Sequence, residues 1–118
     1  MSDGFEAEKS TASTWFRTLR DDIVAAFEGL EDSPTGGGEP GRVEVTETKR
    51  SSDDGADAGG GLMAVMRGGR VFEKVGVNVS AVYGQLGASA QKAMAARGVP
   101  GMEADPRFWA SGISLVAH

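Results

Sequence analysis

The chain contains no cysteine and a single histidine among its 118 residues. Without cysteine there is no disulfide framework, no thiolate metal site and no cysteine nucleophile. No apolar run approaches the ~20 residues that cross a bilayer. The first segment, MSDGFEAEKS, is acidic and has neither the apolar core of a secretory signal nor the arginines of a transit peptide. These absences predict a cytoplasmic protein with no membrane span.

An excess of basic charge is also missing, because the formal net charge at pH 7 is −5. Nucleic acids and anionic membrane surfaces bind basic faces, so neither is an expected partner. Glycine is abundant, and much of it falls in the runs Gly36–Gly38 and Gly59–Gly61. Neither run fits a dinucleotide or P-loop pattern, and the residues after Gly61 resemble a strand, so no nucleotide site is expected.

The first half of the chain predicts one helix and a polar connection. Apolar residues recur at three- and four-residue steps from Thr14 to Leu30, which is typical of a helix packed on a sheet. The stripe consists of Phe16, Leu19, Ile23, Ala26, Phe27 and Leu30. A serine or threonine between Ser10 and Thr14 is expected to cap this helix. The range 33–58 is predicted to be a flexible linker with a short edge strand at Arg42–Lys49.

The centre of the chain predicts a hairpin. Leu62–Arg67 and Arg70–Tyr83 are predicted strands, joined by a two-residue turn at Gly68 and Gly69, because glycine supplies the positive φ angles of such a turn. A short helix, Ala88–Arg97, and a last strand, Phe108–His118, complete the set. We therefore expect a single domain over residues 1–118, with an α+β fold in which helices flank an antiparallel sheet.

The last two strands each have two different faces, because side chains alternate along a strand. In the hairpin strand, one face holds Val71, Val75, Val77 and Val79, and the other holds Lys74, Gly76, Asn78 and Ser80. In the last strand, one face holds Trp109, Ile113 and Leu115, and the other holds Ala110, Gly112, Ser114, Val116 and His118. The bulky face is expected to fill the core, which leaves the small and polar face toward a cavity.

Ser114 and His118 are the candidate site residues of the last strand. They share a face but lie about 13 Å apart at ~3.3 Å per residue, whereas proton transfer needs atoms within ~3 Å. They are therefore not a nucleophile and its base. The spacing suits two contacts along one large flat ligand; the alternative is a buried serine bonded to a neighbouring carbonyl and a histidine at a frayed strand end.

Three cations, Arg67, Arg70 and Lys74, cluster around the predicted hairpin. A guanidinium there can pair with a carboxylate through two parallel N–H bonds. The alternative is ordinary surface charge beside a turn, since most cationic side chains are exposed.

Three blocks together resemble the oxygen-dependent coproporphyrinogen III oxidase family. They are the glycine-rich strand entry at Gly59–Gly61, VFEKVGVN at Val71–Asn78 and GISLVAH at Gly112–His118. The resemblance implies a broad antiparallel sheet flanked by helices. It also implies that two propionates of coproporphyrinogen III become vinyl groups, which gives protoporphyrinogen IX in haem biosynthesis. Dioxygen is then the co-substrate, and neither flavin nor nicotinamide is expected.

The resemblance also implies roles for particular residues. Ser114 matches a serine that contacts substrate, and His118 matches a histidine described as a ligand of a possible divalent metal. One imidazole cannot form a metal site alone, because zinc takes four ligands and iron three or more. A homodimer is implied, with Val71, Phe72, Glu73 and Lys74 at its interface.

The family's chain continues past the point where this sequence stops. The sequence is therefore expected to be an incomplete domain, the N-terminal part of such an oxidase, and inactive by itself. The alternative is a non-catalytic sheet module that self-associates, or a fragment that binds a tetrapyrrole without converting it.

Overall fold

The computed structural model describes residues 5–33 and 37–118. Within them, the elements follow one another as α1 (Glu6–Asp32), β1 (Val43–Ser51), β2 (Asp57–Arg67), β3 (Lys74–Gln85), α2 (Ala88–Ala96) and β4 (Arg107–Ala117). The strands form one antiparallel sheet in the order β1-β2-β3-β4. The predicted α+β fold is confirmed. In this part of the chain, no helix is long and apolar enough to cross a membrane.

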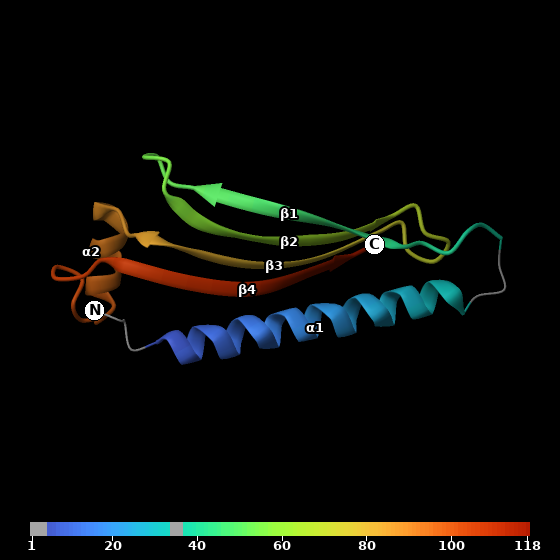
Figure 1. The fold of residues 1–118 in the computed structure, drawn as a ribbon, viewed down its shortest axis with the longest axis horizontal. Helices are drawn as coiled ribbons and strands as arrows, with labels where there is room; N and C mark the ends of the chain where they lie inside the picture. The colour runs from blue at the N-terminus through green and yellow to red at the C-terminus, as the bar shows by residue number, and fades with distance from the viewer. Residues whose placement is uncertain (1–4, 34–36) are drawn as a thin grey trace.

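The molecule is elongated, with extents of 60 × 28 × 27 Å. Figure 1 shows α1 running along the sheet, and α2 at the end where β3 stops and β4 begins. The buried cluster of the sheet consists of Ala64, Met66, Val75 and Val77, and Ile23, Val24 and Phe27 of α1 pack against it. One face of the sheet is therefore the core face, and α1 covers it chiefly at β3 and β4.

Helix α1 is longer than its apolar stripe predicted. Ser10 to Thr14 lie inside the helix, and Phe5 precedes it without any side-chain cap, so the predicted capping residue is wrong. Leu30, expected to face the sheet, is 51% exposed. The inward position of the last turn is instead Glu31, which lies four residues after Phe27 and is completely buried.

The predicted edge strand is confirmed, because β1 has β2 as its one neighbour in the sheet. Together with the start of β2, β1 occupies much of the range 33–58, and residues 34–36 lie outside the described part of the chain. The second helix is also confirmed: α2 ends at Ala96, and Gly98 follows with a φ of +85°.

The two-residue turn at Gly68 and Gly69 is wrong. Arg67 pairs with Lys74, so residues 68–73 connect the strands, closed by a hydrogen bond of 2.9 Å from the Gly68 N–H to the Glu73 carbonyl. Of the two glycines, Gly68 alone has a positive φ, at +63°. Residues 70–72 leave the ladder between β2 and β3 because their N–H groups bind a different acceptor.

That acceptor is the buried carboxylate of Glu31. Its Oε1 accepts hydrogen bonds from the N–H groups of Gly41 and Arg70, both at 2.7 Å. Its Oε2 accepts from Val71 and Phe72, both at 2.8 Å. One side chain therefore binds the end of α1 to the segment before β1 and to the connection before β3.

The hydrogen bonds to Glu31 outweigh the effect of its burial. Burial by itself raises the pKa of a carboxyl group, because the charged form loses its hydration. The N–H groups of Gly41, Phe72, Val71 and Arg70 stabilise the charged form, and the net result lowers the Glu31 pKa from 4.5 to about 2.

The contacts around Glu31 leave no room for a further side chain at Gly69. A Cβ placed there would lie 2.7 Å from both carboxylate oxygens of Glu31. Arg70 reinforces the connection from outside, because its guanidinium donates from Nε to the Glu31 carbonyl at 2.5 Å and from Nη2 to the Asp32 carbonyl at 3.0 Å. The last carbonyls of α1 thus receive donors from the β2–β3 connection.

We predict that Glu31→Gln destabilises the chain strongly. The amide nitrogen that replaces one oxygen is itself a donor, and it would meet N–H groups that have no other acceptor. The melting temperature should fall by at least about 5 °C, measured by circular dichroism at pH 7. The matched control is Glu28→Gln, since Glu28 accepts one N–H, from Val43 at 2.9 Å, which an amide oxygen can still accept. Equal losses from the two variants would contradict this account.

The same carboxylate should make the stability of the folded chain depend on pH. Because the folded-state pKa of Glu31 is depressed, the stability it contributes is complete above the unfolded value of 4.5 and is lost as the pH falls toward about 2. The difference in unfolding free energy between the natural chain and Glu31→Gln should shrink between pH 5 and pH 2.5 in urea titrations. A difference that stays constant over this window would rule out the charged form as the source.

Candidate functional site

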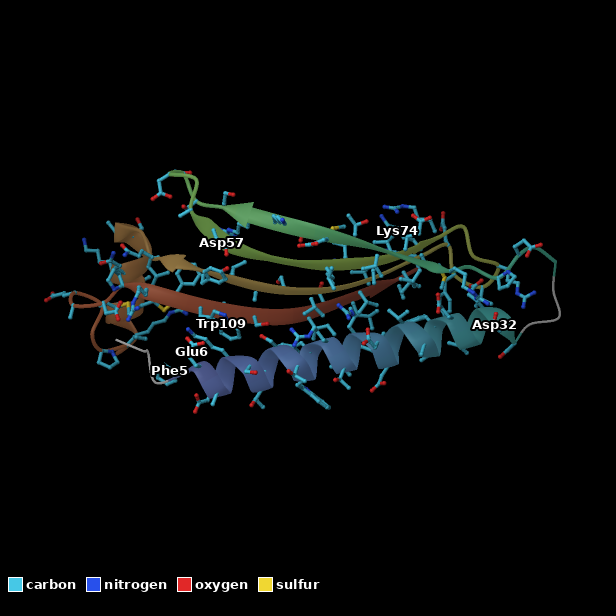
Figure 2. All side chains as sticks on the ribbon, in the orientation of Figure 1. Phe5, Glu6, Asp32, Asp57, Lys74 and Trp109 are labelled. Carbon is cyan, nitrogen blue, oxygen red and sulfur yellow. The ribbon has the colours of Figure 1, made fainter. Side chains whose placement is uncertain are left out.

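The face of the sheet opposite α1 contains the candidate site residues. Asn78 of β3 and Ser114 of β4 are directly paired in the antiparallel register, with Ser80 paired to Gly112 on one side and Gly76 to Val116 on the other. Ser114 is exposed on this open face. The predicted division of β4 is confirmed in part: Ile113 packs against the core while Ser114 does not, but Leu115, expected to fill the core, is 47% exposed. Figure 2 shows Trp109 on the side of β4 that faces the start of α1.

Two glycines leave open space between the side chains of this face. No atom lies within 4 Å of the position that a Cβ would take at Gly76 or Gly112. These two glycines flank the Asn78–Ser114 pair diagonally. A planar ligand can therefore approach the backbone of both strands at this point.

Asn78 has an unsatisfied polar atom beside Ser114. Its Oδ1 is buried and has no hydrogen-bond donor among the described residues. A buried acceptor without a donor is destabilising, and such atoms in folded proteins call for a ligand, a water molecule or a functional role. From the sequence, Asn78 was placed on the polar face of its strand but given no role. The one feature that could have indicated a role is its position beside Gly76 on that face.

Ser114 does not behave as a structural serine. The alternative considered from the sequence was a buried serine bonded to a neighbouring carbonyl. Ser111 of the core face makes such a bond, since its hydroxyl donates to the Ser80 carbonyl at 2.8 Å, although Ser111 is only half-buried. Ser114 forms no such bond within the described residues, which leaves its hydroxyl available on the open face.

His118 lies beyond the end of β4 and is exposed, but its backbone is held. Its N–H donates to the Lys74 carbonyl, and its carbonyl accepts from Glu73, both at 2.8 Å. No three histidine, aspartate, glutamate or cysteine side chains gather as metal ligands in the part of the chain that is described. The described residues therefore do not form a metal site by themselves.

The cations of the predicted cluster separate into two groups. Arg70 binds carbonyls at the end of α1, so it is a structural residue. Arg67 and Lys74 are a directly opposed pair, both exposed, and alternation places them on the same face as Asn78. Like charges opposite each other repel, and a bound carboxylate would relieve that repulsion.

The predicted interface residues lie in the connection before β3 and at its first residue. Val71 is 47% exposed, and Glu73 and Lys74 are exposed. Phe72 turns inward instead and makes an edge-to-face contact with Phe27, with ring centroids 4.9 Å apart. Val71, Glu73 and Lys74 are thus available to a partner, whereas Phe72 is used to hold α1.

Comparisons with known proteins support the family resemblance that the three sequence blocks indicated. A family profile described as coproporphyrinogen III oxidase matches residues 11–118. The chain is 45% identical over 112 residues to an oxygen-dependent coproporphyrinogen-III oxidase of Rickettsia bellii, a match that covers 93% of this chain and 36% of that relative. Proteins with the same name in Rickettsia felis and Rickettsia africae are 41% identical with the same coverage. No solved structure was found to match.

The chain belongs to the coproporphyrinogen III oxidase family. It spans 36% of the length of these relatives.

We predict that Asn78→Val stabilises the chain. The substitution removes the unsatisfied Oδ1 and places a β-branched side chain in a strand, which should raise the unfolding free energy by about 1 kcal/mol. Ser80→Val is the matched control, because Ser80 is an exposed polar residue on the same face of the same strand. Urea denaturation of both variants should show a larger gain at position 78. A loss at 78, or equal gains, would mean that Asn78 is satisfied in solution.

Proposed function

We propose that this chain supplies the Ser114 side of the substrate site of an oxygen-dependent coproporphyrinogen III oxidase. The observation that carries the proposal is the pairing of Ser114 with Asn78 on an open, glycine-flanked sheet face, in a chain that matches the family over residues 11–118. In the proposal the flat macrocycle of coproporphyrinogen III lies against this face.

The polar groups of the open face suit such a ligand. The Ser114 hydroxyl can donate to a propionate oxygen, and the Asn78 amide can bond a pyrrole N–H once its oxygen turns outward. Arg67 and Lys74 lie at one end of the same face, where they can pair with a carboxylate. Each residue then binds or orients substrate, and none is proposed as a general acid or base.

The proposed reaction converts two propionates of coproporphyrinogen III to vinyl groups, which yields protoporphyrinogen IX. Loss of carbon dioxide from one propionate with formation of the vinyl group releases two electrons and one proton. Dioxygen is the proposed acceptor of these electrons. A divalent metal would need ligands from outside the described residues in addition to His118. The proposal also includes a cytoplasmic homodimer with Val71, Glu73 and Lys74 at its interface.

A non-catalytic, self-associating module is the second candidate. The observation that favours it is the pair of sheet edges, β1 and β4, each with one neighbour in the described structure. The N–H and C=O groups of an uncovered edge can pair with another strand. The hairpin strand β3 is not such an edge, because β2 and β4 flank it on both sides.

We predict that the 118-residue chain alone does not convert coproporphyrinogen III in air. In a chimera that places residues 11–118 in the matching part of the Rickettsia bellii relative, Ser114→Ala should lower kcat/KM by about tenfold, the effect expected from loss of one hydrogen bond to a charged group. Ser111→Ala is the control on the other face of the same strand and should change kcat/KM less than about twofold. Porphyrin fluorescence after oxidation of the product measures the rates.

Two outcomes would contradict the proposal. The first is turnover by the 118-residue chain at a rate near that of the chimera, which would mean that the site is complete here. The second is an equal loss from Ser111→Ala and Ser114→Ala, which would mean that the open face has no special place in substrate binding.

A further inference from the structure

A groove of about 820 Å³ lies on the core face of the sheet, between α1 and the part of β1, β2 and β3 that α1 does not cover. Its walls include Arg17 and Arg20 from α1, Lys49 and Arg50 from β1, and the apolar residues Leu62 and Val79. The sheet separates this groove from Ser114, which belongs to the opposite face. The groove is therefore distinct from the proposed substrate face.

The groove concentrates positive charge in a chain whose net charge is −5. Four cations line it, two from the helix wall and two from the strand wall, against the acidic Glu47 and Asp57. Asp57 lies at the start of β2 (Figure 2) and is already bonded, since it accepts from the Gly59 N–H at 3.0 Å and from the Tyr83 hydroxyl. These bonds lower the Asp57 pKa and keep its carboxylate charged, so the four cations face two carboxylates and the lining retains an excess of positive charge.

Lys49 of the strand wall has Asp57 as an acidic neighbour, but the two are not close enough to form a salt bridge. Within residues 5–33 and 37–118, neither Lys49 nor Arg50 forms a salt bridge. Lys49 lies near enough to Asp57 to help lower the Asp57 pKa, after the larger effects of the Tyr83 and Gly59 hydrogen bonds. The strand wall therefore presents charge that a bound anion can pair with.

The helix wall contains a donor without an acceptor. The Arg20 side chain is 12% exposed, and both its Nε and its Nη2 donate to the same oxygen of Asp21, at 3.0 and 2.9 Å. Its Nη1 is buried and has no acceptor among the described residues. A buried guanidinium N–H without an acceptor is destabilising, and a small rotation of the side chain would present it to an anion in the groove.

We propose that this groove binds a small molecule with an apolar body and carboxylates at two or more positions on its rim. Cations on two facing walls require negative groups at both ends of the ligand, and Leu62 and Val79 between them suit an apolar middle. The groove volume lies within the roughly 300–1,000 Å³ of small-molecule sites. Guanidinium groups bind carboxylates in a planar, bidentate manner, which favours this anion.

Two sources offer this chemistry: a tetrapyrrole with propionate side chains and a free polycarboxylate of smaller size. Coproporphyrin III, the air-stable oxidised form of the proposed substrate, represents the first, and benzenetricarboxylate represents the second. The 118-residue chain is titrated with each at low ionic strength, by porphyrin fluorescence and by calorimetry. Binding of either supports the proposal, and competition between them shows whether one groove accepts both.

Substitutions of the groove cations test whether the probes bind in the groove. Arg17→Gln with Lys49→Gln removes one cation from each wall at exposed positions, so folding should be kept, and affinity should fall at least about tenfold. Lys92→Gln with Arg97→Gln removes the same charge from exposed positions in and beside α2, outside the groove, and should weaken binding less than about threefold. Arg20→Gln should weaken binding as well, and amide shifts should map to residues 47–50 and 79–81.

The proposal is overturned if neither probe binds at millimolar concentration, or if the groove and α2 variants lose affinity equally. It is also overturned if Ser114→Ala abolishes binding while Arg17→Gln with Lys49→Gln does not. That last result places the porphyrin on the open face, which would support the proposed function while removing the second site. The experiments therefore distinguish a failure of the groove proposal from a failure of the proposed substrate site at Ser114.

Discussion

The carboxylate of Glu31 is the interaction on which the arrangement of this molecule depends. It accepts N–H groups from Gly41 and from residues 70–72, segments that are far apart in the sequence. These donors belong to irregular backbone, which has no ladder to supply acceptors. Removing the carboxylate would leave them unpaired in a buried place. One side chain therefore sets the position of α1 on the sheet and the path of the chain into β1 and β3.

The position of α1 in turn decides what the two faces of the sheet can do. Phe27 packs on Phe72 directly beside the Glu31 contacts, so the C-terminal half of the helix is held close to the sheet. The helix covers β3 and β4 more than β1, which leaves the groove lined by Arg17 and Lys49 on the same face. The opposite face has no long helix in the described structure, so Ser114 is exposed there, while Asn78 beside it is half-buried.

The regular parts of the fold could be predicted from the sequence because they depend on local periodicity. Alternation in β4 correctly separated Ile113 from Ser114, and the three-to-four-residue stripe found α1. The errors occur where a distant acceptor overrides a local preference. Gly68 and Gly69 are typical of a two-residue turn, but the N–H groups of residues 70–72 bind Glu31. A glutamate at a helix end usually indicates exposure, and no local pattern announces four donors from other segments.

The candidate site was only partly predictable for a related reason. Residue type and alternation identified Ser114 and its face, whereas the importance of Asn78 depends on an unpaired oxygen, which only packing reveals. Likewise Arg70 resembled Arg67 in the sequence, yet the carbonyls of Glu31 and Asp32 bind it. Cations near a turn thus fall into structural and available groups only after the backbone acceptors around them are known.

On the open face, β3 and β4 have cations at one end only. A macrocycle with carboxylates around its rim, laid on the open face, meets Arg67 and Lys74 at one end and neutral groups at Asn78 and Ser114. The carboxylates at its other end then have no cation on the open face of β3 or β4, because the one cation of β4, Arg107, alternates to the core face and binds Asp105 at 2.7 Å. On the proposed binding mode, those carboxylates would need cations from elements other than β3 and β4.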